Sequence, residues 1–188
     1  DLAPSSLARK CSALRQFYRF LYAEGRRRDD PAAVLAGPKR SRPLPKILSV
    51  GEVDRLLAAA HAEPERDAVS DGERLRRLRL ACLLELLYAT GLRVSELIAL
   101  PASAARQDAR LLMVRGKGEK ERLVPILPVT RAAIERYAGL VPFTLDPDAP
   151  IFRGAKGGPL SPRIIQLAIA RLRDALQLPA TATPHALR

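Results

Sequence analysis

Apolar residues recur three to four positions apart along most of the chain, which is the spacing of amphipathic helices. The first such stretch covers residues 5–24 and ends at Gly25, a natural helix stop. Asp30 and Pro31 then match the cap and first position of a short helix closed by Gly37. Further helices are expected at 49–60, 71–90, 94–100, 130–140 and 162–177, with a Ser49–Glu52 capping box and with Asp71 and Ser161 as caps.

Within 71–90, the half from Leu78 to Leu87 is apolar almost all round, which predicts a central buried helix. Thr183 and Pro184 match the cap and first position of a last helix at the end of the chain.

The pattern changes to short β-like runs at 111–114 and 123–126, on either side of a glycine-containing turn. This arrangement predicts a β-hairpin, and Ile151–Phe152 suggests one more short strand. The expected fold class is therefore mainly α with a small β-hairpin or sheet, that is, α+β.

A basic, proline-rich segment, PKRSRPLP at 38–45, interrupts the helical pattern. Prolines exclude regular helix there, so the segment is expected to be an extended linker. Residues 1–42 also hold ten Lys and Arg against four Asp and Glu. We therefore expect one domain to end near residue 42, and a second to cover 43–188.

Composition limits the class of protein. The 188 residues are 47% hydrophobic and 28% charged, which excludes disordered, collagenous and membrane-embedded chains. No signal peptide is visible, and Cys11 and Cys82 fit buried free thiols in the cytoplasm better than a disulfide. Two histidines and two cysteines far apart argue against a structural zinc site.

Net charge points to a partner. Lys and Arg outnumber Asp and Glu by 32 to 20, and a domain this basic usually meets a polyanion, most commonly nucleic acid. The alternative is a Lys/Arg-rich solubility surface. The residues expected to contact DNA are Arg26, Arg27, Arg28, Lys39, Arg40, Arg42, Lys120, Arg122 and Arg163.

Three short motifs carry candidate chemistry. In ATGLRVSEL, at 89–97, Arg93 follows a buried helix and so has a rigid support that suits phosphate binding, with Glu96 placed to brace it. The alternative is an arginine that satisfies helix C-terminal carbonyls.

In RGKGEKER, at 115–122, glycines on both sides of Lys117 let this lysine approach a backbone or deliver a proton, unless the segment is only a solvated turn. In PHALR, at 184–188, His185 and Arg188 would share one face of a first helical turn, an anion-binding position, unless they are a surface pair.

In this order and spacing, the three motifs resemble those of the tyrosine recombinase (phage integrase) family, and most closely its bacterial Xer-type members. The resemblance covers about residues 5–188. It implies a helical core-binding domain ending near residue 42, followed by a catalytic domain that breaks off after the HxxR motif. It also implies that the chain is a piece of a longer protein.

The resemblance assigns roles to four residues. Arg93 and Arg188 would stabilise charge on the scissile phosphate, Lys117 would protonate the leaving 5′ oxygen, and His185 would act as an acid/base or hydrogen-bond donor. The family joins DNA to a tyrosine through a 3′-phosphotyrosyl bond and needs neither ATP nor a metal.

The family's nucleophilic tyrosine follows the HxxR motif, whereas Tyr18, Tyr22, Tyr88 and Tyr137 all precede it. Tyr88 and Tyr137 are expected to be core or half-buried residues. We therefore expect this 188-residue chain to be unable to cleave DNA, although the longer parent would be an enzyme.

The resemblance implies double-stranded DNA as partner, other recombinase protomers assembled as a tetramer on two DNA sites, and a DNA translocase as a further candidate. An Xer-like role in chromosome partition and cell division is the first expectation. The alternatives are a mobile-element integrase, a basic DNA-binding module without chemistry, and a type IB topoisomerase, which shares the chemistry but has different motifs.

Overall fold

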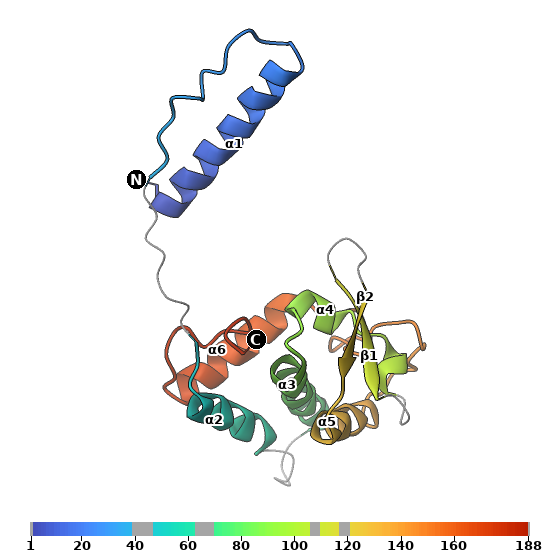
Figure 1. Cartoon of the computed structure of the whole chain (residues 1–188). Helices are drawn as coiled ribbons and strands as arrows, with labels where there is room; N and C mark the ends of the chain where they lie inside the picture. Colours follow the sequence, from blue (N-terminus) through green and yellow to red (C-terminus); the bar gives the residue numbers. More distant parts are fainter. Residues whose placement is uncertain (1, 39–46, 63–69, 106–109, 117–120, 188) are drawn as a thin grey trace. The chain divides into compact units, whose positions relative to one another are not determined.

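The computed structural model describes residues 2–38, 47–62, 70–105, 110–116 and 121–187. Its contacts divide the chain into two compact units, Asp1–Pro45 and Lys46–Arg188 (Figure 1). The expected domain boundary near residue 42 lies outside the described residues. The same is true of six site candidates: Lys39, Arg40, Arg42, Lys117, Lys120 and Arg188.

The first unit is built on helix α1, Pro4–Ala23, as the apolar spacing predicts. Gly25 ends it with a left-handed φ of +66°. The short helix predicted after Asp30 is wrong, because residues 31–34 form turns. The Asp30 carboxylate does accept the Ala32 N–H at 3.0 Å, but of residues 31–34 Ala32 alone is buried and Val34 is 88% exposed, so too little apolar surface is buried to stabilise so short a helix.

Helices α2 (Val50–His61) and α3 (Asp71–Thr90) form the centre of the second unit. The predicted capping box of α2 is present, with Ser49 and Glu52 bonded reciprocally. The cap of α3 is Ser70 rather than the predicted Asp71, which is the first helical residue.

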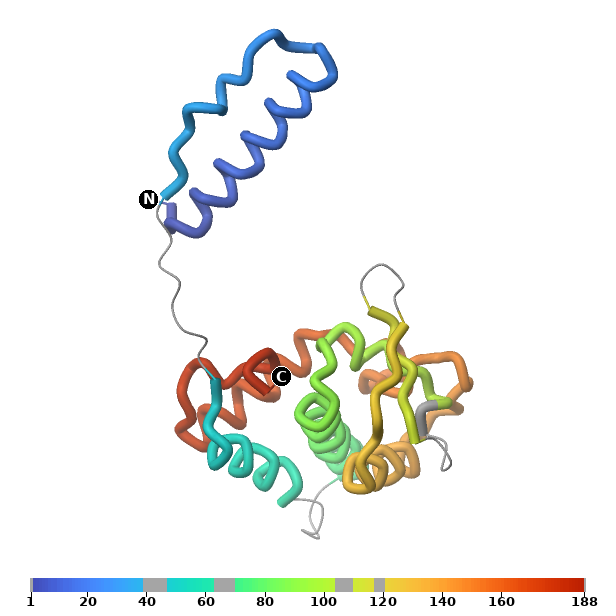
Figure 2. Tube along the Cα trace, viewed as in Figure 1, coloured from blue at the N-terminus to red at the C-terminus, as the bar shows by residue number. Residues whose placement is uncertain are grey.

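The second half of α3 is buried almost all round, as predicted, because helices surround it. Figures 1 and 2 show α3 running through the middle of this unit, with α2 on one side and α5 (Pro128–Ala138) on the other. It also packs on α4 (Val94–Ile98) and α6 (Pro162–Ala175). Any residue fixed to the end of α3 therefore has a rigid base.

The predicted hairpin is present as strands β1 (Leu111–Arg115) and β2 (Glu121–Pro125), paired antiparallel with Met113 opposite Leu123. A 3-10 helix, η1 (Ala102–Ala105), precedes it. The chain is thus mainly helical with a two-stranded sheet, which confirms the predicted fold class.

Residues Ile151 and Phe152 do not form the predicted strand; they lie between two isolated β-bridges, at Pro150 and Arg153. Both are fully buried, and the Phe152 ring stacks on Tyr137 at 5.3 Å between centroids. Their apolar character therefore reflects core packing rather than a strand. Within the described ranges, no helix is long and apolar enough to cross a membrane.

Candidate active site

The end of α3 positions Arg93. Gly91 closes the helix with a φ of +60°, and its N–H donates to the Leu87 carbonyl at 3.0 Å. Leu92 is fully buried, so the turn is anchored in the core. Arg93 is then the N-cap residue of α4, with its side chain half exposed. The sequence prediction of a cation on rigid support is confirmed.

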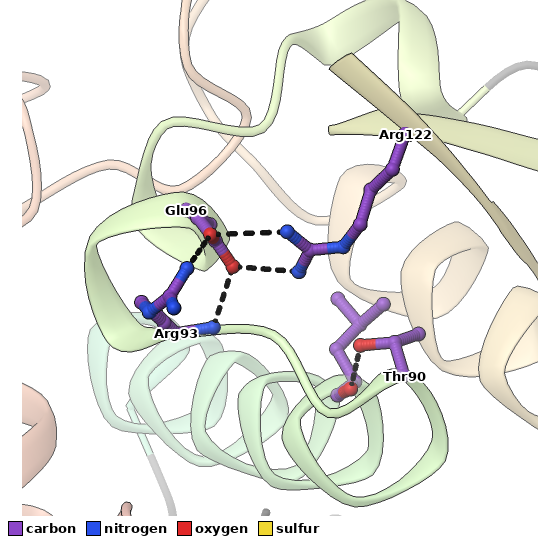
Figure 3. Close-up of polar contacts among 5 residues, drawn as sticks. Thr90, Arg93, Glu96 and Arg122 are labelled. Atoms are coloured by element: carbon purple, nitrogen blue, oxygen red, sulfur yellow. Dashed lines mark hydrogen bonds and ion pairs between the residues drawn. The ribbon is translucent and has the colours of Figure 1, made fainter. Parts of the chain in front are cut away.

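The carboxylate of Glu96 joins two arginines from separate elements (Figure 3). Its Oε2 accepts the backbone N–H of Arg93 at 2.8 Å, and its Oε1 accepts Nη1 of the same residue at 2.9 Å. Arg122, on β2, donates from Nη1 to Oε1 at 3.2 Å and from Nη2 to Oε2 at 2.9 Å. The side chain of Glu96 is only 5% exposed, so this charge cluster has a buried centre.

The two arginines keep Glu96 ionised. The hydrogen bonds from Arg122 contribute most to lowering the pKa of Glu96, to about 2; burial opposes them, and the bonds from Arg93 add to the lowering. The same carboxylate raises the pKa of Arg122. Two cations and one anion leave the cluster positive, which suits a site that receives a phosphate.

His185 lies beside the same turn. It is exposed, in a single turn closed by the Ala186 N–H on the Thr183 carbonyl, at the place where the sequence predicted the first turn of a last helix. It shares the lining of a cavity of about 380 Å³ with Val94, the residue after Arg93. The fold thus brings the His185 and Arg93 segments to one cavity although some ninety positions separate them.

The residue before Arg188 is also anchored at this end of α3. Leu187 is buried, and it lines a cavity of about 320 Å³ together with Tyr88 and Gly91. Of the two alternatives expected for Tyr88, core or half-buried, the structure agrees with the second, since Tyr88 is 46% exposed. It lies on the last turn of α3, past the fully enclosed stretch, where it borders a cavity that Val50 and Val53 of α2 also line.

Comparison with known proteins shows the family of the chain. Residues 46–188 match the model of the phage integrase family. The chain belongs to this family. It is similar to the tyrosine recombinase XerD of Brucella abortus biovar 1 (strain 9-941), with 46% identity over 190 residues, 99% of this chain and 61% of the relative.

The integrase-family chain is also similar to XerD of Bradyrhizobium diazoefficiens, with 59% identity over 133 residues, 71% of this chain and 42% of the relative. It thus spans 42% to 61% of the length of these two relatives. Among solved structures it shares its fold with the Tn1549 transposon integrase in complex with a circular intermediate DNA, at a TM-score of 0.73 and 18% identity, over 99% of this chain and 65% of that chain.

The other predicted DNA contacts of this integrase-family chain have different surroundings. Arg26, Arg28 and Arg163 are exposed. Arg27 pairs with Asp29 at 3.0 Å, so an acidic neighbour partly offsets its charge. Arg122 is bonded to Glu96 instead of pointing free into solvent.

Sequence reasoning missed this contact between Arg122 and Glu96. The spacing of three residues indicated that Glu96 could brace Arg93, because residues i and i+3 are neighbours on a helix. Nothing in the sequence alone links Glu96 to a strand 26 positions later. The burial of Glu96, which the structure shows and the sequence does not, is what requires a further partner, since a buried carboxylate needs donors.

Proposed function

We propose that this chain is the catalytic portion of a tyrosine site-specific recombinase, which cuts and rejoins double-stranded DNA through a 3′-phosphotyrosyl intermediate. Membership of the phage integrase family supports the chemistry. The observation that carries the proposal is the position of Arg93. Its guanidinium donates to Glu96, and the next residue, Val94, lines the same cavity as His185. A plain DNA-binding module has no need of such a convergence.

The roles follow from phosphoryl transfer. A tyrosine oxygen attacks phosphorus, and the bond from phosphorus to the 5′ oxygen breaks. Arg93 and Arg188 stabilise the charge that develops on the non-bridging oxygens, because fixed donors there need no reorganisation. Lys117 gives a proton to the departing 5′ oxygen, and His185 exchanges a proton or donates a hydrogen bond at the phosphate. Rejoining runs the same steps in reverse.

The nucleophile is proposed to be a tyrosine that follows the HxLR motif in the parent protein, as in the family. Tyr137 is 1% exposed, and its hydroxyl accepts the Arg153 N–H at 3.2 Å, so it is a core residue. Tyr88 is exposed, but it belongs to α3, ahead of Arg93. We therefore propose that the 188-residue chain forms no covalent bond with DNA.

The biological role is proposed to be Xer-like resolution of chromosome dimers, because both relatives reported above are XerD proteins. On this proposal, residues 1–42 end a DNA-binding domain, four protomers assemble on two DNA sites, and a DNA translocase is a further candidate partner. A solved lambda integrase tetramer is bound to a Holliday junction, which makes a tetramer reasonable. Mobile-element integration is the alternative, supported by the fold shared with a transposon integrase.

A nicked suicide DNA substrate, analysed on a denaturing gel, tests the chemistry. The parent protein should give a covalent protein–DNA band, and the 188-residue chain should give none. Arg93→Ala in the parent should remove the band, at a cost of roughly 3 kcal/mol or more in transition-state stabilisation, while sparing most DNA binding.

The matched control for Arg93→Ala is Arg76→Ala, which removes an exposed arginine near the opposite end of the same helix and should leave the band unchanged. A covalent band from the 188-residue chain would show that an upstream tyrosine serves as nucleophile. No band from the unaltered parent would favour a binding module without chemistry.

A further inference from the structure

Arg122 connects the hairpin to the turn that carries Arg93. It is the second residue of β2, opposite Val114 on β1, and its guanidinium forms two parallel bonds to the carboxylate of Glu96. Such a fork-to-fork contact fixes both distance and angle between its partners. In Figure 3 the arginine reaches from the strand toward α4, and the carboxylate lies between the two guanidinium groups.

The contact leaves Arg122 poorly placed to hold a DNA phosphate. One N–H on each of its terminal nitrogens already donates to Glu96, which fixes the direction of the guanidinium, and its side chain is 39% exposed. Arg115 on the paired strand is a contrast: it is 76% exposed, and its Nε–H donates to the exposed Glu121 at 2.9 Å. If Arg122 turned to a phosphate, the buried Glu96 would lose half of its hydrogen bonds, which is costly for a buried charge.

The charges of Arg93, Glu96 and Arg122 explain what this contact does. With Arg122 absent, Glu96 and Arg93 would form a one-to-one ion pair, and the carboxylate would cancel most of the field that Arg93 presents to a phosphate. With Arg122 present, both carboxylate oxygens have a second donor, and the cluster keeps a net positive charge. The remaining donors of Arg93 are then available for an incoming anion.

We propose that Arg122 is a positioning residue, which holds Glu96 so that Arg93 keeps its orientation and its charge for the scissile phosphate. This inference rests on the proposed recombinase function. It replaces the expectation from sequence that Arg122 contacts DNA directly. Because Arg122 lies on the hairpin, it also makes the Arg93 turn depend on the hairpin being folded.

The test compares Arg122→Ala, Arg122→Lys, Glu96→Gln and the double variant Arg122→Ala/Glu96→Gln in the parent protein, with Arg115→Ala as the matched control from the same hairpin. Two quantities are measured: the rate of covalent adduct formation at saturating DNA, and the dissociation constant for duplex DNA over a range of salt concentrations. Urea unfolding identifies any variant that fails to fold.

A positioning role predicts that Arg122→Ala slows adduct formation by between about tenfold and about a hundredfold, the range typical of a misplaced catalytic group. The dissociation constant and its salt slope should stay close to those of the unaltered protein. Arg122→Lys should also be slow, because an ammonium makes no fork. The double variant should be no slower than the worse single variant, since both act through one contact. Arg115→Ala should cleave normally.

A phosphate contact predicts the opposite: Arg122→Ala would reduce the salt slope by about one, and Arg122→Lys would restore binding and cleavage. That result would overturn the proposal. Carbon-13 NMR titration of Glu96 in the 188-residue chain separates this failure from failure of the recombinase function. The pKa of Glu96 should rise in Arg122→Ala whether or not the parent cleaves DNA, and an unchanged value would also overturn the proposal.

Discussion

Glu96 shows how one residue can serve two others. An isolated buried carboxylate would be strongly unfavourable, but here four hydrogen bonds from two arginines offset the loss of water. Three of these bonds come from guanidinium groups, which are charged at all relevant pH values. The carboxylate is therefore ionised wherever the protein functions, and it acts as a fixed structural anion rather than as a proton carrier.

A pH dependence of stability follows from this residue. Because folding lowers the pKa of Glu96 from 4.5 to about 2, its stabilising contribution is complete above about pH 4.5 and is lost as the pH falls through about 2. That contribution is on the order of 3 kcal/mol. In urea unfolding, the difference between the unaltered chain and Glu96→Gln should therefore shrink over this range.

The control for this measurement is Glu73→Gln. Glu73 also pairs with arginines, but it lies at the surface, where an ion pair contributes little to stability. Its substitution should cost less than about 1 kcal/mol at neutral pH. Equal losses of unfolding free energy in Glu96→Gln and Glu73→Gln would contradict the conclusion that Glu96 contributes more to stability than a surface carboxylate.

Among the helices, α3 has the largest effect on the site, because its last turn sets where Arg93 emerges. Gly91 adopts a left-handed backbone there, and a side chain would be strained. Gly91→Ala should therefore lower the free energy of unfolding by about 1 to 2 kcal/mol and slow adduct formation in the parent.

Gly51→Ala is the matched control for Gly91→Ala. Gly51 lies in the first turn of α2, and nothing is within 4 Å of the place where its Cβ would sit. Alanine there should be neutral or stabilising by up to about 1 kcal/mol. Equal urea midpoints for the two variants would show that the left-handed turn at Gly91 is not strained by a side chain.

The elements that the sequence predicted correctly are those whose signal is local. The capping box of α2, the glycine stop of α3 and the two β-like runs on either side of a glycine-containing turn each depend on neighbouring residues only. The failure at Ile151 and Phe152 depends on a distant partner. Ile151 and Phe152 are apolar because they meet Tyr137, and periodicity cannot distinguish this from a strand.

In the candidate site, too, the contacts between sequence neighbours were predictable and the contacts between distant segments were not. Arg93 and its brace Glu96 were predictable, since they are three positions apart on one turn. The contribution of Arg122 and the shared cavity of Val94 and His185 depend on the tertiary fold. Only the resemblance to a family connected those segments before the structure did.

For the molecule as a whole, the net charge of +12 is what the proposed binding to DNA depends on. Each phosphate neutralised by a cation releases counterions, so affinity falls steeply as salt rises. A chain making about four such contacts should lose about a hundredfold in affinity between about 50 and 200 mM salt. Fluorescence anisotropy with a labelled duplex measures this, and an affinity that does not change with salt would contradict it.

The bond from the Arg93 backbone N–H to Glu96 offers a view of the site in solution. An amide held by a buried carboxylate exchanges its hydrogen with water only when that contact opens. The deuterium exchange rate of this single amide therefore reports how often Arg93 loses its support. This rate can be followed without DNA, without a nucleophile and without turnover. It therefore measures, in the protein alone, the fraction of time for which Glu96 holds Arg93.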